Sequence, residues 1–180
     1  MEKSDLIRTI ETHKIESERL FYRLLSGEDK TLFLNIEEMP IDGELSDIQA
    51  KAWEEAESSE SFTLIASDKS TDENIGYIML KKLNSCPEIG VTVKAEFRGA
   101  GLGYEMCRTI IDYCFAYTNA EKLDYHCFRN NKKSSHLAEK LGAVLVEEHP
   151  FMSFFKSGEL SAEDQTEVSG FDLLVYEILK

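Results

Sequence analysis

Between positions 98 and 103 the chain reads Arg98-Gly99-Ala100-Gly101-Leu102-Gly103, a basic residue followed by three glycines in five positions. Glycine lacks a Cβ atom, so such a loop lets a bulky anion approach the backbone closely. Arg98 adds a charge-assisted donor at the start of the loop. The spacing therefore predicts a loop that holds a ligand's pyrophosphate on the backbone of residues 99–104, with Tyr104 at its end.

The residues on either side of this loop predict the elements that position it. The short, uncharged and largely β-branched run Ile89–Val93 is typical of a buried strand. After the loop, apolar residues recur at helical spacing: Leu102, Met106, Ile110, Tyr113, Cys114 and Tyr117. A helix is therefore expected from the glycines to about Thr118, and its unpaired N–H groups and positive dipole end suit an anion.

Other glycine-rich loops fit less well. A plain strand-to-helix turn accounts for one or two glycines but not for three behind an arginine. A P-loop needs a Lys-Ser or Lys-Thr pair after its last glycine, and none follows here. A dinucleotide fingerprint fails because its third glycine position falls on Tyr104 or Met106.

The spacing Arg98-x-x-Gly101-x-Gly103 resembles the acetyl-coenzyme A signature of the GNAT N-acetyltransferase superfamily. Asn131-x-x-Ser134, followed by the segment 139–143, is similar to a second motif of that superfamily, with alanine where phenylalanine is usual. The resemblance implies an α/β (α+β) fold: a single domain with a central mixed, mostly antiparallel sheet flanked by helices.

Both ends of the chain resemble one branch of the superfamily. Residues 18–23 and 172–176 are similar to the opening and closing segments of the RimJ/RimL-like ribosomal-protein alanine acetyltransferases. The resemblance covers residues 15–180 and leaves a polar lead, residues 1–14. It implies an enzyme that moves an acetyl group from acetyl-CoA to a primary amine by direct attack in a ternary complex. The amine is expected to be a peptide or protein α-amine or a small amine.

The resemblance also implies roles for individual residues. The backbone of Val91 and Val93 would contact the pantetheine arm, and Asn131 would contact the cofactor, cap the following helix, or do both. Glu88, at the start of the cleft strand, is the candidate general base, although it could be an ordinary strand-end acid. Ser134 is the candidate donor to the leaving sulfur, although it could serve only helix packing.

The proton chemistry depends on the acceptor. Deprotonating a lysine side chain at pH 7 costs about 4.6 kcal/mol, whereas an α-amino group costs about 1 kcal/mol, so a modest carboxylate suffices only for the latter. Many members of the superfamily carry a tyrosine seven residues after the motif asparagine, and that position is Ala138 here. His126, Cys127 and His136 lie in the same half and are interpreted as packing or surface residues.

Composition limits the partners. The chain has 180 residues, 42% of them hydrophobic, which suits one domain, and its net charge of −14 argues against nucleic acid. Residues 94–140 carry a net charge of +2, so the remainder carries −16. This division suits a polyanionic cofactor on one side and a cationic amine on the other, unless the acidic surface serves only solubility.

Several classes of site and location are not expected. The four cysteines and four histidines show no metal-binding spacing, so no metal is expected, and no G-x-S-x-G motif supports a serine hydrolase. Without a signal peptide or a long apolar run, a cytoplasmic monomer or homodimer away from membranes is expected. A non-catalytic acyl-CoA-binding domain and an acidic protein-interaction module remain as alternatives.

The remaining pattern predicts the order of elements. Helices are expected over residues 26–36, 47–57 and 132–141, and strands over 18–24, 62–67, 76–83, 88–93, 122–128, 144–148 and 171–179. Residues 151–170 form a long acidic connection that either borders the acceptor site or is mobile.

Overall fold

The computed structural model describes residues 2–36, 46–150 and 171–180. In these residues the α-helices are α1 (Lys3–Thr12), α2 (Lys30–Ile36), α3 (Ser46–Glu57), α4 (Leu102–Tyr117) and α5 (Lys132–Lys140). The strands are β1 (Leu20–Leu24), β2 (Phe62–Asp68), β3 (Asn74–Lys81), β4 (Glu88–Val93), β5 (Lys122–Phe128), β6 (Val144–His149) and β7 (Leu173–Leu179). Two short 3-10 helices, η1 (Gly27–Asp29) and η2 (Ala95–Phe97), precede α2 and the glycine-rich loop.

The strands of the described part form one sheet in the order β1-β2-β3-β4-β5-β7-β6. Every neighbouring pair is antiparallel except β4 and β5, which run parallel. The predicted α/β fold with a mixed, mostly antiparallel sheet is confirmed. The expected elements also appear, with ends that shift by a few residues. The predicted connection over residues 151–170 lies outside the described residues.

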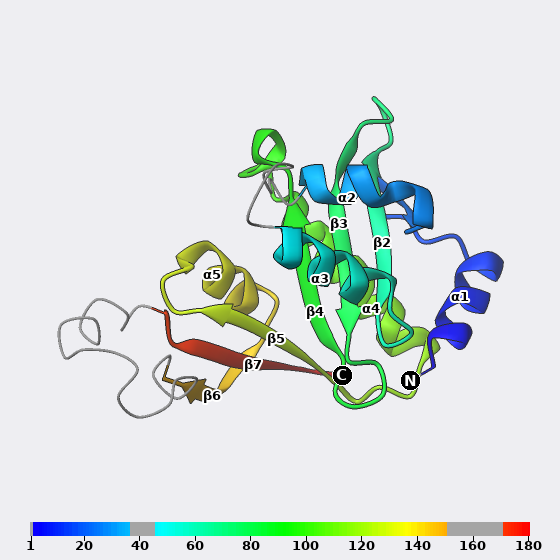
Figure 1. The fold of residues 1–180 in the computed structure, drawn as a ribbon. Helices are drawn as coiled ribbons and strands as arrows, with labels where there is room; N and C mark the ends of the chain where they lie inside the picture. The colour runs from blue at the N-terminus through cyan, green and yellow to red at the C-terminus, as the bar shows by residue number, and fades with distance from the viewer. Residues whose placement is uncertain (1, 37–45, 151–170) are drawn as a thin grey trace.

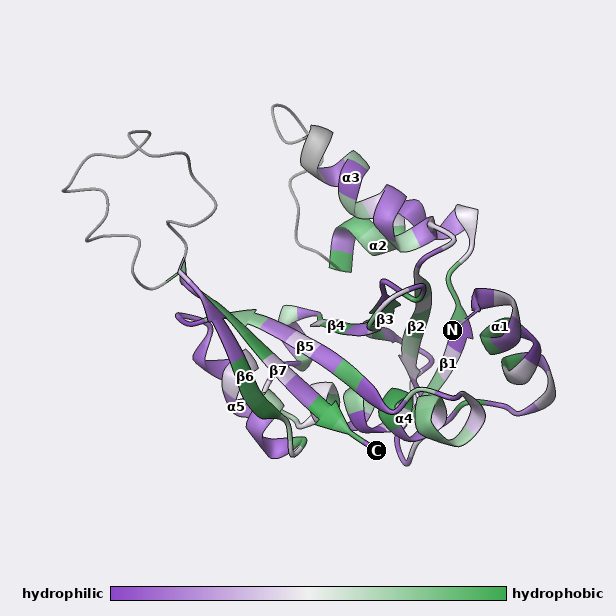
Figure 2. Cartoon of the chain, turned by 90° about the horizontal axis from the view of Figure 1, so that it is seen from below, coloured by the Kyte–Doolittle hydropathy of each residue, from purple (hydrophilic) through white to green (hydrophobic). Residues whose placement is uncertain are grey.

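The helices cover the two faces of the sheet unequally. Figure 2 shows α2 and α3 over one face of the β2–β4 region and α4 over the other, with α5 beside the β5–β7–β6 group. In Figure 1 the β5–β7–β6 group diverges from β4 and carries α5 with it. The sheet therefore has a continuous first half and a second half that branches away at the β4–β5 pair.

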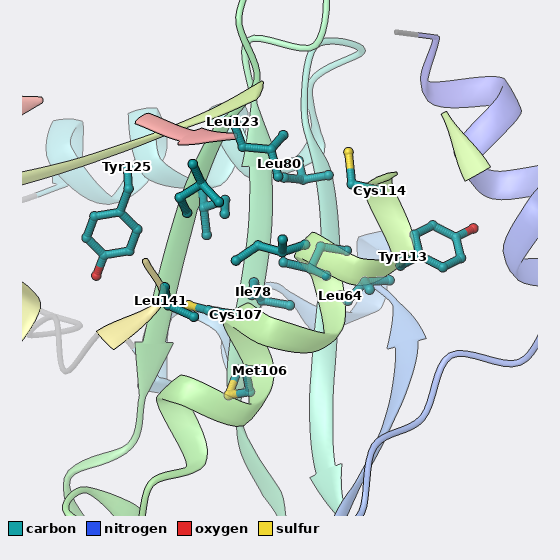
Figure 3. Packing of buried hydrophobic residues seen from close by; sticks show 14 of the residues in the cluster. Leu64, Ile78, Leu80, Met106, Cys107, Tyr113, Cys114, Leu123, Tyr125 and Leu141 are labelled. Carbon is teal, nitrogen blue, oxygen red and sulfur yellow. The ribbon is translucent and has the colours of Figure 1, made fainter. Parts of the chain in front are cut away.

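The main core lies between the sheet and α4. Figure 3 shows Met106 and Cys107 of α4 packed among strand residues that include Ile78 and Leu80. The helix forms here because its apolar residues fall on one face, and that face is buried from Leu102 to Cys114. The N-terminal segment joins the same core: α1 buries Leu6, whose carbonyl accepts a hydrogen bond from the Tyr113 hydroxyl at 3.0 Å.

A smaller core holds α2 and α3 on the opposite face. Phe33 stacks on Tyr77 of β3, with ring centroids 4.7 Å apart, and meets Trp53 of α3 edge-on. The start of this layer is fixed by a capping box between Ser26 and Asp29. Asp29 also accepts two hydrogen bonds of 2.7 Å from the Arg23 guanidinium, so β1 and α2 are tied together.

Candidate active site

The β4–β5 pair opens shortly after it begins. Only Glu88 and Ile89 of β4 have register partners on β5, namely Asp124 and Tyr125. Residues 90–93 continue to pair with β3 but not with β5. Within the described residues, this leaves one edge of β4 available for a ligand to pair with, which is the geometry expected for the pantetheine arm.

A cavity of about 320 Å³ lies at this opening. Residues from α2, α3 and the β3–β4 ladder form one wall, and β5 and α5 contribute the other: Phe33, Ala52, Glu55, Tyr77, Met79, Lys81, Glu88, Ile89, Gly90, Val91, Thr92, Tyr125, His126 and Ser134. The cavity therefore reaches both the α4 side and the α2–α3 side of the sheet.

The glycine-rich loop joins β4 and η2 to α4. Gly99 and Gly101 have φ angles of +86° and +79°, which non-glycine residues rarely adopt. The first hydrogen bond of α4 runs from the Glu105 amide to the Gly101 carbonyl, at 3.2 Å. The amides of Leu102, Gly103 and Tyr104 precede that bond at the positive end of the helix, so they are suited to bind a phosphate.

Residues far away in the sequence brace this loop. Glu105 accepts hydrogen bonds from the Arg19 amide at 2.8 Å and the Ser17 hydroxyl at 2.6 Å. The Arg19 guanidinium contacts Glu105 and donates to the Ala100 carbonyl at 3.0 Å. Sequence reasoning assigned no role to Arg19, because the contact spans more than 80 positions and leaves no local pattern.

The other predicted cofactor residues occupy suitable positions. Val91 and Val93 pack against the main core, and they lie in the part of β4 that has no register partner on β5. Arg98 directs its Nε to the Val93 carbonyl at 2.8 Å, so it joins the end of β4 to the loop. Ala100 lies exposed between the two positive-φ glycines.

Glu88 lies among cations rather than at an open strand end. Its side chain is only 8% exposed, and its Oε1 lies 3.2 Å from Lys81 Nζ. Its Oε2 lies 2.6 Å from Lys82 Nζ and 3.2 Å from His126 Nδ1. Burial raises the pKa of Glu88, but the hydrogen bond from Lys82 and the charge of Lys81 outweigh it and hold the pKa below its ordinary value. We refer to Lys81, Lys82, Glu88 and His126 as the acceptor-side cluster.

His126 is the member of this cluster that sequence reasoning set aside. The structure places it on β5 at the opening, where it lines the cavity. Its Nε2 is buried, and among the described residues no polar group lies within hydrogen-bonding distance of it. The sequence gives little indication of this role for His126, because nothing in the local sequence links it to Glu88, which lies on another strand.

Ser134 faces the cavity from the first turn of α5. Its hydroxyl lies 2.8 Å from the hydroxyl of Tyr125, and its amide donates to Asn131 Oδ1 at 3.1 Å. Asn131 is thus the N-cap of α5, one of its two predicted roles. Burial raises the pKa of Tyr125, so this phenol stays protonated and is able to donate to Ser134.

The other residues that the sequence singled out after β5 begins lie in the core or at the surface. Ala138, at the position where a tyrosine is usual, is fully buried in the main core, so the phenol at this site comes from Tyr125 on β5. Cys127 is buried, and the His136 side chain is 79% exposed.

The described residues hold neither a metal-ligand cluster nor a membrane-spanning helix. They contain no cluster of three or more His, Cys, Asp or Glu side chains arranged to hold a metal ion. No helix among them combines the length and apolar character needed to cross a bilayer.

Comparison with known proteins supplies the family. Residues 7–144 match the family model described as an acetyltransferase (GNAT) domain. No curated protein matches the sequence. Among solved structures, spermidine N-acetyltransferase from Vibrio cholerae in complex with CoA and spermine aligns with a TM-score of 0.66 and 18% identity, covering 89% of this chain and 95% of that one.

Two further structures share the fold. The dodecameric Vibrio cholerae spermidine N-acetyltransferase aligns with a TM-score of 0.66 and 19% identity, covering 89% of this chain and 94% of that one. A domain from Methanocaldococcus jannaschii has a TM-score of 0.66 and 17% identity, covering 92% of this chain and 100% of that one.

Proposed function

The chain belongs to the GNAT acetyltransferase family and is an acetyl-CoA-dependent N-acetyltransferase, and on that premise we propose that it acetylates a small cationic primary amine. The observation that carries the proposal is the cavity at the β4–β5 opening, whose wall carries the two carboxylates Glu55 and Glu88 against one lysine, Lys81. A cation is attracted to such a wall, and the net charge of −14 favours its approach.

Polyamines are the first class of acceptor to test. The similar Vibrio cholerae enzymes are described as spermidine N-acetyltransferases, and one is in complex with spermine. A peptide α-amine is the second candidate, because residues 18–23 and 172–176 resemble the RimJ/RimL-like branch. An α-amine also costs less to deprotonate at pH 7 than an alkylamine.

The cofactor fits the residues present. The amides of residues 99–104 are positioned for the pyrophosphate, the free edge of β4 at Val91 and Val93 for the pantetheine arm, and Asn131 for a further contact. Acetyl-CoA supplies an activated acetyl thioester. Because the cavity is open to both faces of the sheet, the amine and the thioester can meet directly in one ternary complex.

The two ends of the cavity have complementary proton chemistry. On the acceptor side, Glu88 provides the negative charge that favours proton removal from the amine. On the other side, Ser134 donates to the departing sulfur, and the Tyr125 hydroxyl, 2.8 Å from that of Ser134, is able to donate to it in turn. A thiol pKa near 8.5 means that this leaving group needs little protonic help.

Release of free coenzyme A across a panel of acceptors tests this function. The panel contains spermidine, spermine, alanyl and seryl peptides, and alcohols of matched size. We expect turnover with one or both amine classes and none with the alcohols. Turnover of alcohols alone would contradict the proposal, and acetyl-CoA binding without transfer to any amine would favour an acyl-CoA-binding domain. Light scattering on the same sample measures whether the protein is a monomer or a homodimer, as the sequence predicts.

A further inference from the structure

We infer that His126 is the group that takes the proton from the acceptor amine, and that Glu88 acts through it as a positioning residue. The inference rests on the proposed function and specifies how its acceptor side operates. It revises the expectation that Glu88 itself meets the amine, and it gives a role to a histidine that looked like a packing residue.

The register of the sheet brings the two side chains together. Glu88 is opposite Asp124 in the parallel β4–β5 pair, and side chains alternate between the two faces of a strand. His126, two residues after Asp124, is therefore on the same face as Glu88 and one step into the opening. Its side chain is 18% exposed and borders the cavity beside Gly90 and Thr92.

The two ring nitrogens of His126 have different surroundings. Nδ1 lies 3.2 Å from Glu88 Oε2, whereas Nε2 is buried with no polar partner among the described residues. A carboxylate next to Nδ1 stabilises the tautomer that carries its proton there. The lone pair is then on Nε2, so the unpaired atom of the ring is its proton acceptor.

Glu88 is poorly placed to take the proton itself. Both of its carboxylate oxygens are engaged, one with Lys81 and the other with Lys82 and His126. The same contacts hold the pKa of Glu88 below its ordinary value, which makes it a weaker base. Its ionised carboxylate is nevertheless well suited to orient a neighbouring imidazole.

The charges around His126 come from several elements. The charged groups that act on it are Lys81 on β3, Lys82 after it, Glu88 on β4 and Asp124 on β5. Glu55 on α3 pairs with Lys81. Burial lowers the pKa of His126, Glu88 and Asp124 raise it, and Lys82 and Lys81 lower it, for a net value below the ordinary one. The ring is therefore neutral at pH 7 and ready to accept a proton.

The acetyl transfer forms one C–N bond and breaks one C–S bond. The nitrogen lone pair of the amine forms the new C–N bond to the acetyl carbon, and one N–H proton moves to His126 Nε2. The C–S bond breaks, and its electron pair stays on the sulfur of coenzyme A. The imidazolium, stabilised by Glu88, later releases its proton to solvent, which restores the neutral ring.

The first experiment reads the tautomer in the intact protein without any turnover. ¹⁵N NMR of histidine-labelled protein, with the His126 signal identified by its loss in His126→Gln, reports which ring nitrogen carries hydrogen. We expect an unprotonated Nε2 at pH 7 and a titration midpoint below that of a free histidine, about 6.5. A protonated Nε2 in the neutral ring would overturn the inference.

The second experiment uses kinetics with a matched control. At saturating acetyl-CoA, His126→Gln should lower kcat by about 10²–10⁴-fold at pH 7 with an unchanged Kd for acetyl-CoA. The same substitution at exposed His136 should change neither quantity. In Glu88→Gln the acid limb of the pH–rate profile should move to lower pH, because a group that raises the pKa of His126 is removed.

The kinetics of wild type and variants distinguish a wrong assignment of the base from a wrong proposed function. Wild-type turnover of amines with an unimpaired His126→Gln would overturn the inference and leave the proposed function intact. No wild-type turnover of any amine would overturn the proposed function and this inference with it. An acid limb that disappears in Glu88→Gln but persists in His126→Gln would restore Glu88 as the base.

Discussion

The acceptor-side cluster gathers at the start of β4 and the glycine-rich loop follows the end of that strand, but the chain builds the two in different ways. The loop is a contiguous stretch, residues 98–104, and its amides are presented by the start of one helix. The cluster is assembled from β3, the turn after it, β4 and β5, and its contacts join side chains up to 38 positions apart. The loop therefore depends on backbone geometry, and the cluster depends on charge and register.

The largest effect is expected from breaking the loop's backbone. Gly101→Glu should reduce acetyl-CoA affinity by more than about 100-fold, because a φ of +79° strains the new residue and its charge repels phosphate. Isothermal titration calorimetry measures this loss. Gly142→Glu is the matched control, since Gly142 has a φ of +83° with open space around it and follows α5. Equal affinities for the two variants would contradict the assignment of the loop.

On the acceptor side, Asp29 anchors the layer that carries Phe33 to the cavity wall. Asp29→Asn should lower the free energy of unfolding by about 1–3 kcal/mol at pH 7, because its bonds to Arg23 and Ser26 are charge-assisted. The folded-state pKa of Asp29 lies below its ordinary value, so this stabilisation exists above the unfolded pKa of about 3.9 and is lost as pH falls below it.

Urea unfolding of both proteins at pH 7 and pH 3 checks the prediction for Asp29. Asp112→Asn removes an exposed ion pair with Arg108 and should cost less than about 0.5 kcal/mol. A difference between wild type and Asp29→Asn that stays constant with pH would exclude the ionic explanation.

Ser134→Ala tests the leaving-group end of the cavity. We expect kcat to fall about 3–10-fold, the size of one ordinary hydrogen bond, with little change in acetyl-CoA affinity. Tyr125→Phe removes only the group that supports Ser134 and should have a smaller effect. Steady-state kinetics at saturating acetyl-CoA measure both variants, and a Tyr125→Phe defect larger than that of Ser134→Ala would instead assign the proton to the phenol.

The smallest effect is expected from the distant brace of the loop. Arg19→Gln removes the contacts to Ala100 and Glu105 and should weaken acetyl-CoA binding by up to about fivefold, as expected for a half-exposed ion pair. Calorimetry under the conditions used for Gly101→Glu measures the change. A loss as large as that of Gly101→Glu would show that the loop depends on long-range contacts as much as on its glycines.

Most of the fold and the loop could be predicted because their determinants are local. The apolar spacing of α4 and the β-branched run of β4 predict each element from its own residues. The position of β7 between β5 and β6 was not predicted, because it depends on pairing across the whole sheet. His126 was interpreted as packing for the same reason, since its partner Glu88 is brought to it only by the parallel register of β4 and β5.

The most direct measurement compares acetyl-CoA affinity and amine turnover in Glu88→Gln and Gly101→Glu. If the acceptor-side cluster and the glycine-rich loop have separate tasks, Glu88→Gln should keep the wild-type Kd for acetyl-CoA and lose about 10²–10⁴-fold in kcat at pH 7, because His126 loses the carboxylate that holds its reactive tautomer. That loss should shrink as pH rises toward the pKa of the acceptor amine, and Glu11→Gln, on exposed α1 surface, should behave as wild type. Gly101→Glu should show the reverse pattern, with binding lost first. A Glu88→Gln protein that fails to bind acetyl-CoA, or that turns over amine at the wild-type rate, would contradict the account.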